Sequence, residues 1–381
     1  MKVLAPLLLA LVVNLAAAQE VVRPELGKPL QAAQEAAKAG KYDEALARLR
    51  EADAVPNLTP HEAFLIARLR GFSALGAGDT ATAIQAFELV ANASETQPDE
   101  LQRTLEALAN TAYRAKDYPK ATVAVERYFK AGGTSDALRV MLAQSRYLQG
   151  DVAGAARDLT ALIAADDAAK RATPEIQLRL LANCQQQLKD EAGYVATLER
   201  LLAAYPKPDY WADRLARVAR QPGFAERLVL DVYRLKAATG NFSDADAVQM
   251  AKLALLAGLP GEAKKVVGDR DAALRQQAER QAAADKMGPA EENAARAAKD
   301  GNALFNLGYA MASGGDVAKG LPLMEQGLAK GGLKRLDDAK LHLGLTQAQA
   351  GRKDDARQTL AGVQGSDGAS DLARLWTLTL R

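Results

Sequence analysis

Apolar residues recur along this chain at helical spacing, and small residues interrupt them at a fixed interval. Near the C-terminus, Leu307-Gly308 is followed by Gly315, Gly320 and Met324. The same order returns 36 residues later, from 308 to 344, at Gly344, Gly351, Ala356 and Leu360. This period is typical of helix-pair arrays, in which a small residue lets antiparallel helices approach and a turn glycine adopts a positive φ. The pattern predicts an all-α fold, a right-handed superhelical solenoid of antiparallel helix pairs.

The N-terminal half carries the same signal, a turn residue followed five positions later by alanine. The pairs are Gly40 with Ala45, Gly78 with Ala83, Lys116 with Ala121, and Gly150 with Ala155. Helix starts fit this phase, because Thr59-Pro60 precedes Glu62 as in a capping box, and Ser243-Asp244 opens a later helix. The array is therefore expected to extend almost from the first residues of the mature chain.

Two prolines at 206 and 208 predict a break in the array, because proline disfavours helix at the residue before it. We expect four segments. They are a signal peptide at 1–18, an N-terminal array at 19–207, degenerate repeats with a charged alanine-rich insert at 208–300, and C-terminal repeats with a capping helix at 301–381.

The first eighteen residues form a segment of another kind. Lys2 precedes an apolar stretch at 3–15, and Ala16-Ala17-Ala18 offers a small-residue cleavage pattern before Gln19. The apolar stretch is shorter than a bilayer span requires. These features predict a bacterial signal peptide and a mature protein that is secreted across the inner membrane, periplasmic, soluble and not embedded in a membrane.

Composition argues against catalysis and nucleic-acid binding. The formal net charge is +2, from 49 basic and 47 acidic residues, so no strong field attracts nucleic acid. The chain has two histidines, His61 and His342, and one cysteine, Cys184, so we expect no metal site and no cofactor. Cys184 lies beside Leu181 in a predicted helix and is interpreted as a buried apolar residue rather than a reactive thiol. We therefore expect a protein that is not an enzyme.

The repeating positions resemble the tetratricopeptide repeat. One unit is matched by Leu304, Leu307, Gly308, Gly315, Gly320 and Met324, and another by Gly71, Gly78, Ala83 and Phe87. The chain departs from the family pattern at Ala109, Ala143 and Tyr194. The resemblance implies a scaffold that binds protein partners on a concave surface.

The C-terminal half is also similar to a group of periplasmic tetratricopeptide proteins associated with the TonB energy-transduction system. The resemblance depends on Tyr-Pro and Tyr-Trp within 205–211, Leu-Ala-Gly-Leu-Pro-Gly at 256–261, and the apolar closing stretch at 372–376. It implies a helper of TonB-dependent transport with TonB-system components as partners. Two alternatives remain open: an assembly factor for outer-membrane or cell-wall machinery, and a helical module beside a murein-processing enzyme.

The repeat phase predicts which side chains line the concave surface. They are Arg68, Phe72, Glu106, Asn110, Tyr113, Gln144, Tyr147, Arg179, Asn183, Gln186, Phe305 and Tyr309. We expect this lining to bind an extended peptide or a partner helix, with aromatic anchors and amides that bond its backbone. Arg179 and Asn183 also resemble a pair with which tetratricopeptide domains grip C-terminal carboxylates. The alternative is that these residues form ordinary solvated helix faces.

Overall fold

The computed structural model describes residues 22–285 and 287–380, and all regular structure in these ranges is helical. The predicted signal peptide at 1–18 lies outside the described residues. The chain divides into two compact units: unit 1 ends at Tyr194 and unit 2 begins at Val195. In the described part of the chain, no helix combines the length and apolar character needed to cross a bilayer. The all-helical solenoid predicted from the repeat pattern is confirmed.

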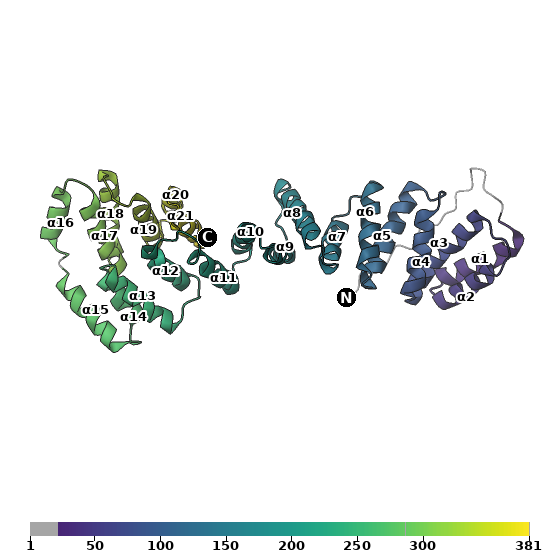
Figure 1. The fold of residues 1–381 in the computed structure, drawn as a ribbon, viewed down its shortest axis with the longest axis horizontal. Helices are drawn as coiled ribbons and strands as arrows, with labels where there is room; N and C mark the ends of the chain where they lie inside the picture. The colour runs from purple at the N-terminus through teal and green to yellow at the C-terminus, as the bar shows by residue number, and fades with distance from the viewer. Residues whose placement is uncertain (1–21, 286, 381) are drawn as a thin grey trace. The chain divides into compact units, whose positions relative to one another are not determined.

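Unit 1 is a series of antiparallel helix pairs in which each helix packs against the next (Figure 1). Its helices are α1 (Pro24–Lys38), α2 (Tyr42–Asp53), α3 (Pro60–Ala77), α4 (Thr80–Asn92), α5 (Pro98–Arg114), α6 (Tyr118–Lys130), α7 (Asp136–Leu148), α8 (Val152–Ala168) and α9 (Glu175–Gln187). The alanines that set the repeat phase, Ala45, Ala83, Ala121 and Ala155, are all 0% exposed. A methyl group is thus the side chain that fits where two helices of a pair meet, as the sequence predicts.

Local signals in unit 1 fix where helices begin and turn. The Thr59 hydroxyl accepts a hydrogen bond from the Glu62 backbone N–H at 3.2 Å, and the Glu62 carboxylate accepts one from the Thr59 N–H at 2.9 Å. The same carboxylate pairs with Arg23, with 2.7 Å between Nη2 and Oε2, which ties the start of α1 to α3. At the end of α3, Gly78 adopts φ 80°, whereas the equivalent turn after α5 places Lys116 at φ 62°.

In unit 2, the last helix packs back against earlier helices of the same unit. The repeat pattern does not predict this packing. Helix α10 (Glu191–Ala204) spans the division between the units. The helices that follow it are α11 (Pro208–Val218), η1 (Glu226–Leu228), α12 (Val229–Ala238), α13 (Asp244–Leu256), α14 (Pro260–Val267), α15 (Ala272–Ala284), α16 (Pro289–Ala297), α17 (Asn302–Gly314), α18 (Val317–Lys330), α19 (Leu336–Gln349), α20 (Lys353–Ala361) and α21 (Ala369–Thr379). The last helix, α21, packs against α12 and α19, and α14 packs against α17 (Figure 1). Leu372 and Leu375 therefore share a core with Trp211 and Leu215.

The C-terminal glycines have the steric role that their spacing predicts. A Cβ added to Gly308 on α17 would lie 2.6 Å from the carbonyl oxygen of Gly320 on α18. A Cβ on Gly320 would lie 2.3 Å from the Gly308 carbonyl oxygen. Because neither position has room for a side chain, the two backbones pack in direct contact.

The helix break expected at the two prolines is present, since α10 ends at Ala204 and α11 begins at Pro208. The compact units divide at 194, thirteen residues before 207, and the expected segments 208–300 and 301–381 both fall in unit 2. The division of the chain into segments at 207 and 300 stays a prediction.

Candidate functional site

Three helices of unit 1, each the first of a helix pair, present side chains to one surface hollow of about 290 Å³. We name it the α5–α9 hollow, because its lining comes mainly from α5, α7 and α9, the first helices of their pairs. The lining residues are Tyr113, Gln144, Tyr147, Leu148, Ile176, Arg179, Leu180 and Asn183. Five of these residues were expected on the concave surface, namely Tyr113, Gln144, Tyr147, Arg179 and Asn183.

Hydrogen bonds between neighbouring repeats fix the polar side chains of this hollow. The Tyr113 hydroxyl donates to Gln144 Oε1 at 3.1 Å. The Tyr147 oxygen accepts from Asn183 Nδ2 at 3.0 Å and from Gln187 Nε2 at 2.8 Å. A tyrosine oxygen that accepts two hydrogen bonds keeps its own proton free to donate, so Tyr147 offers an oriented donor to a ligand.

Tyr113 also keeps its proton, which it donates to Gln144 rather than to a ligand. Burial, together with a smaller effect of Tyr118, raises the pKa of Tyr113 above its usual value. The rings of Tyr113 and Tyr118 meet edge to face, with 5.6 Å between centroids. Because the phenol stays protonated, it acts as a hydrogen-bond donor and as an apolar surface at neutral pH.

Arg179 gives the hollow a positive charge that no described residue neutralises. Its guanidinium has no ion-pair partner within residues 22–285 and 287–380, in contrast to Arg68, whose Nε lies 2.5 Å from Glu100 Oε1. Beside Arg179, the side chains of Leu148 and Ile176 are 48% and 60% exposed. A free cation, a free hydroxyl proton and exposed aliphatic groups suit an acidic group next to an apolar side chain.

The repeat phase does not predict four residues of this site: Leu148, Ile176, Leu180 and Gln187. A signal for two of them is present in the sequence. Ile176 lies three residues before Arg179, and Gln187 lies four residues after Asn183, and both spacings place side chains on one helix face. Helical periodicity alone could therefore have added Ile176 and Gln187 to the predicted site.

Five of the expected residues lie in unit 1 outside the hollow. Phe72 is 47% exposed and meets Phe87 edge to face with 5.3 Å between ring centroids. Asn110 donates to the Glu106 backbone carbonyl at 2.8 Å, which engages its amide within its own helix. Arg68 is paired as described above, and Glu106 and Gln186 are exposed.

The two expected residues of unit 2 have different positions. Phe305 was expected on an open surface, but it is 3% exposed and lies in the core with Met324 and Leu343. This expectation is corrected: the following helix pair covers that face of α17, which the phase of one repeat does not reveal. Tyr309 is half-buried and stacks on His342, with 4.3 Å between centroids and 7° between ring planes.

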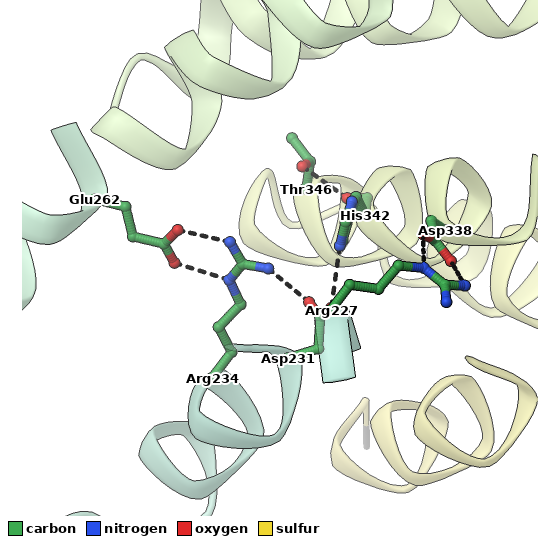
Figure 2. A network of polar contacts seen from close by, with 7 residues as sticks. All are labelled: Arg227, Asp231, Arg234, Glu262, Asp338, His342 and Thr346. Atoms are coloured by element: carbon green, nitrogen blue, oxygen red, sulfur yellow. Dashed lines mark hydrogen bonds and ion pairs between the residues drawn. The ribbon is translucent and has the colours of Figure 1, made fainter. Parts of the chain in front are cut away.

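His342, on which Tyr309 stacks, belongs to a polar network centred on α12. Figure 2 shows Asp231 between Arg234 and His342; the Arg234 Nη1 lies 2.6 Å and the His342 Nε2 3.2 Å from its carboxylate. Glu262 on α14 accepts from Arg234 Nε at 2.8 Å and Nη2 at 2.6 Å. These bonds connect α12 with α14 and α19. Among the described residues, no three His, Cys, Asp or Glu side chains gather as metal ligands would.

Comparison with known proteins gives one match at the level of a family. The tetratricopeptide repeat profile matches residues 178–208, which include most of α9 and all of α10. The match identifies one tetratricopeptide-like repeat within a stretch of packed helices. No curated protein sequence matches the chain.

Solved structures of similar helical proteins are distant in sequence. One is the structure of Naa15/Naa10 bound to HypK-THB, at 16% identity and a TM-score of 0.35, with 91% of this chain and 58% of that chain covered. This chain therefore spans less than two thirds of that protein's length. Another is the P58(IPK) TPR domain, at 13% identity and a TM-score of 0.26, with coverage of 92% and 98%. Yeast Tom70 is similar at 12% identity and a TM-score of 0.26, with coverage of 92% and 94%.

Proposed function

We propose that this chain is a non-catalytic scaffold that binds an extended segment of a partner protein in the α5–α9 hollow. One observation supports this proposal above the others: side chains from three successive repeats converge on one hollow that contains the unpaired Arg179. The segment carries an acidic group for Arg179 and an apolar side chain for Leu148 and Ile176. Tyr147 and Asn183 bond its backbone or its carboxylate.

The proposed location is the bacterial periplasm, and the proposed partners are components of the TonB system. This part of the proposal depends on the leader-like segment at 1–18 and on the C-terminal motifs described above. The α5–α9 hollow supports the proposal that the partner is a segment of a protein. The sequence motifs are the basis for proposing that this protein belongs to the TonB system.

Site-specific photo-crosslinking in living cells tests both parts. A benzophenone amino acid at Tyr147 keeps an aromatic ring in the hollow, whereas the same probe at Arg157, an exposed residue of α8, is the control. We expect a discrete crosslinked protein from position 147 and none from 157, and we expect Arg179→Gln to reduce the crosslink. Equal yields from both positions would contradict binding in the hollow.

The identity of the crosslinked protein decides the second part. Recovery of energy-transduction subunits supports the TonB proposal. Recovery of only outer-membrane assembly factors or wall-synthesis proteins would contradict the TonB proposal. It would not contradict the proposal that the α5–α9 hollow binds a protein segment.

A further inference from the structure

Unit 2 encloses a larger hollow of about 390 Å³, formed because α21 returns to pack on α12 and α19. Helices α12, α13, α14, α17, α19 and α21 all contribute to its walls. This volume lies at the lower end of the 300–1,000 Å³ typical of small-molecule sites. We name it the unit 2 hollow. It is separate from the α5–α9 hollow, and the proposed function does not use it.

Much of the wall is apolar. Met250, Val266, Leu345 and Trp376 line it together with the small side chains of α12. Tyr309 contributes a ring that is held on one side by His342. Binding of an apolar group of a few carbon atoms against this wall is favourable, because it removes apolar surface from water.

Two cations also line the unit 2 hollow. The side chain of Arg234 is 10% exposed, and its hydrogen bonds to Asp231 and Glu262 use three of the five N–H groups of a guanidinium. Two N–H groups therefore remain. Lys265, exposed on α14, has no ion-pair partner in the described part of the chain.

The neighbouring carboxylate does not cancel this preference. Both oxygens of Glu262 accept hydrogen bonds from Arg234, whose single charge also pairs with Asp231, and no ion pair joins Glu262 to Lys265 among the described residues. The ammonium of Lys265 therefore faces the hollow without a counter-ion, and an anionic group of a ligand would supply it.

We infer that the unit 2 hollow binds a small amphipathic carboxylate. The carboxylate group lies toward Lys265 and the remaining N–H groups of Arg234. The apolar body lies against Met250, Val266, Leu345 and Trp376. Polar ligands of equal size and apolar amines bind more weakly, because the former gain little from this wall and the latter place a second cation beside Lys265.

Calorimetric titration of the full chain with octanoate tests this inference, with octylamine and octanol as probes that share its chain length. We expect saturable binding of octanoate at one site and at least tenfold weaker binding of the other two. Arg234 itself is unsuitable for substitution, since its loss would leave Glu262 buried without a partner and Asp231 with only His342.

Lys265 and its neighbour Lys264 give a matched pair of variants, because both are exposed on α14 and only Lys265 lines the hollow. Lys265→Gln should weaken octanoate binding by about three- to tenfold, as expected for one partly solvated charge, and Lys264→Gln should not. Ala238→Phe, at an exposed position in the wall, should abolish binding by filling the space. Equal affinity for octylamine, an unchanged affinity in Ala238→Phe, or no saturable binding would overturn the inference.

Discussion

The side-chain amide of Asn183 donates a hydrogen bond of 3.0 Å to the hydroxyl of Tyr147, 36 residues earlier in the chain. That separation is one repeat, so the bond joins equivalent faces of α7 and α9. Gln187 adds a second donor to the same oxygen at 2.8 Å. The repeat interval thus builds a preorganised polar surface from side chains that are distant in sequence, and a ligand would not have to order these groups on binding.

Removal of the Tyr147 hydroxyl should weaken partner binding without loss of the fold. Tyr147→Phe keeps the ring but leaves the Asn183 and Gln187 amides free to rotate, and it removes the free O–H donor. We expect an affinity about five- to tenfold lower, the effect of one lost hydrogen bond of roughly 1 kcal/mol. Fluorescence anisotropy with the peptide identified by crosslinking measures it.

Arg157→Gln is the control for that experiment, because Arg157 is exposed and does not line the hollow. Its affinity should equal that of the parent protein. Unchanged affinity in Tyr147→Phe would contradict the role assigned to the hydroxyl.

The helix-contact alanines should tolerate no larger side chain. Ala83 is 0% exposed between α3 and α4, and Ala81, two residues away on α4, is exposed. Ala83→Leu should lower the free energy of unfolding by about 1–3 kcal/mol through overpacking. Ala81→Leu should change it by less than about 0.5 kcal/mol. Urea denaturation followed by circular dichroism compares the two variants, and similar midpoints would contradict the packing described for this pair.

Features set by the repeat interval could be predicted from the sequence. The spacing of Ala83 and Ala121 identified buried contacts, and the same phase placed Tyr113 and Tyr147 on one surface. Both follow from helical periodicity, which brings residues three or four positions apart to one face. Local geometry repeats along the array, so one correct phase locates many side chains.

Features set by distant contacts could not be predicted in this way. Arg227 pairs with Asp338, 111 residues later, with 2.7 Å between Nε and Oδ2, and no interval in the sequence connects the two. Phe305 shows the same limit on a smaller scale, since the phase of its own repeat cannot indicate which neighbouring helix covers it. For the same reason, the sequence does not predict that α21 packs on α12 and α19, or that a hollow forms there.

Two turn lysines should be weak points of unit 1. Lys116 and Lys189 adopt φ values of 62° and 58° where the other repeats have glycine. Lys116→Gly should raise the free energy of unfolding by about 0.5–1 kcal/mol, because the left-handed conformation costs a residue with a Cβ roughly that much. Gly78→Ala should lower it by a similar amount, since no atom lies within 4 Å of the added Cβ and only the backbone conformation is penalised. Opposite signs in thermal unfolding are expected, and equal signs would contradict this account.

Asp231 should stabilise unit 2 in a pH-dependent manner. It is 1% exposed; burial acts to raise its pKa, but the charges and hydrogen bonds of His342 and Arg234 outweigh burial and lower the pKa to about 2. An unfolded aspartate has a pKa of about 3.9, so this stabilisation is complete above about pH 4 and is lost as the pH falls toward 2. Asp231→Asn should cost about 1.5–3 kcal/mol at neutral pH, because Arg234 loses a charged hydrogen-bond acceptor and keeps only Glu262 as an ion-pair partner.

Tryptophan fluorescence measures this effect in unit 2 alone, because both tryptophans of the chain, Trp211 and Trp376, lie there. The difference in stability between the parent protein and Asp231→Asn should shrink between about pH 4 and pH 2. Asp354→Asn is the control, since the Asp354 side chain is 97% exposed and its pair with Arg357 contributes little. A difference that is constant over this pH range would contradict the assignment.

Cys184 should be inert in the folded chain and should report the unfolding of unit 1. The residue is 0% exposed on α9, and burial raises the pKa of its thiol to about 11. At pH 8 only about one thiol in a thousand would be ionised, and the thiolate is the reactive form. Ellman's reagent should therefore react with the native chain at least about a hundredfold more slowly than with the chain in denaturant.

Asn183→Cys in a Cys184→Ala background is the matched control: its neighbouring, exposed thiol should react rapidly in the native state. Fast reaction of native Cys184 would contradict its burial between the helices of unit 1.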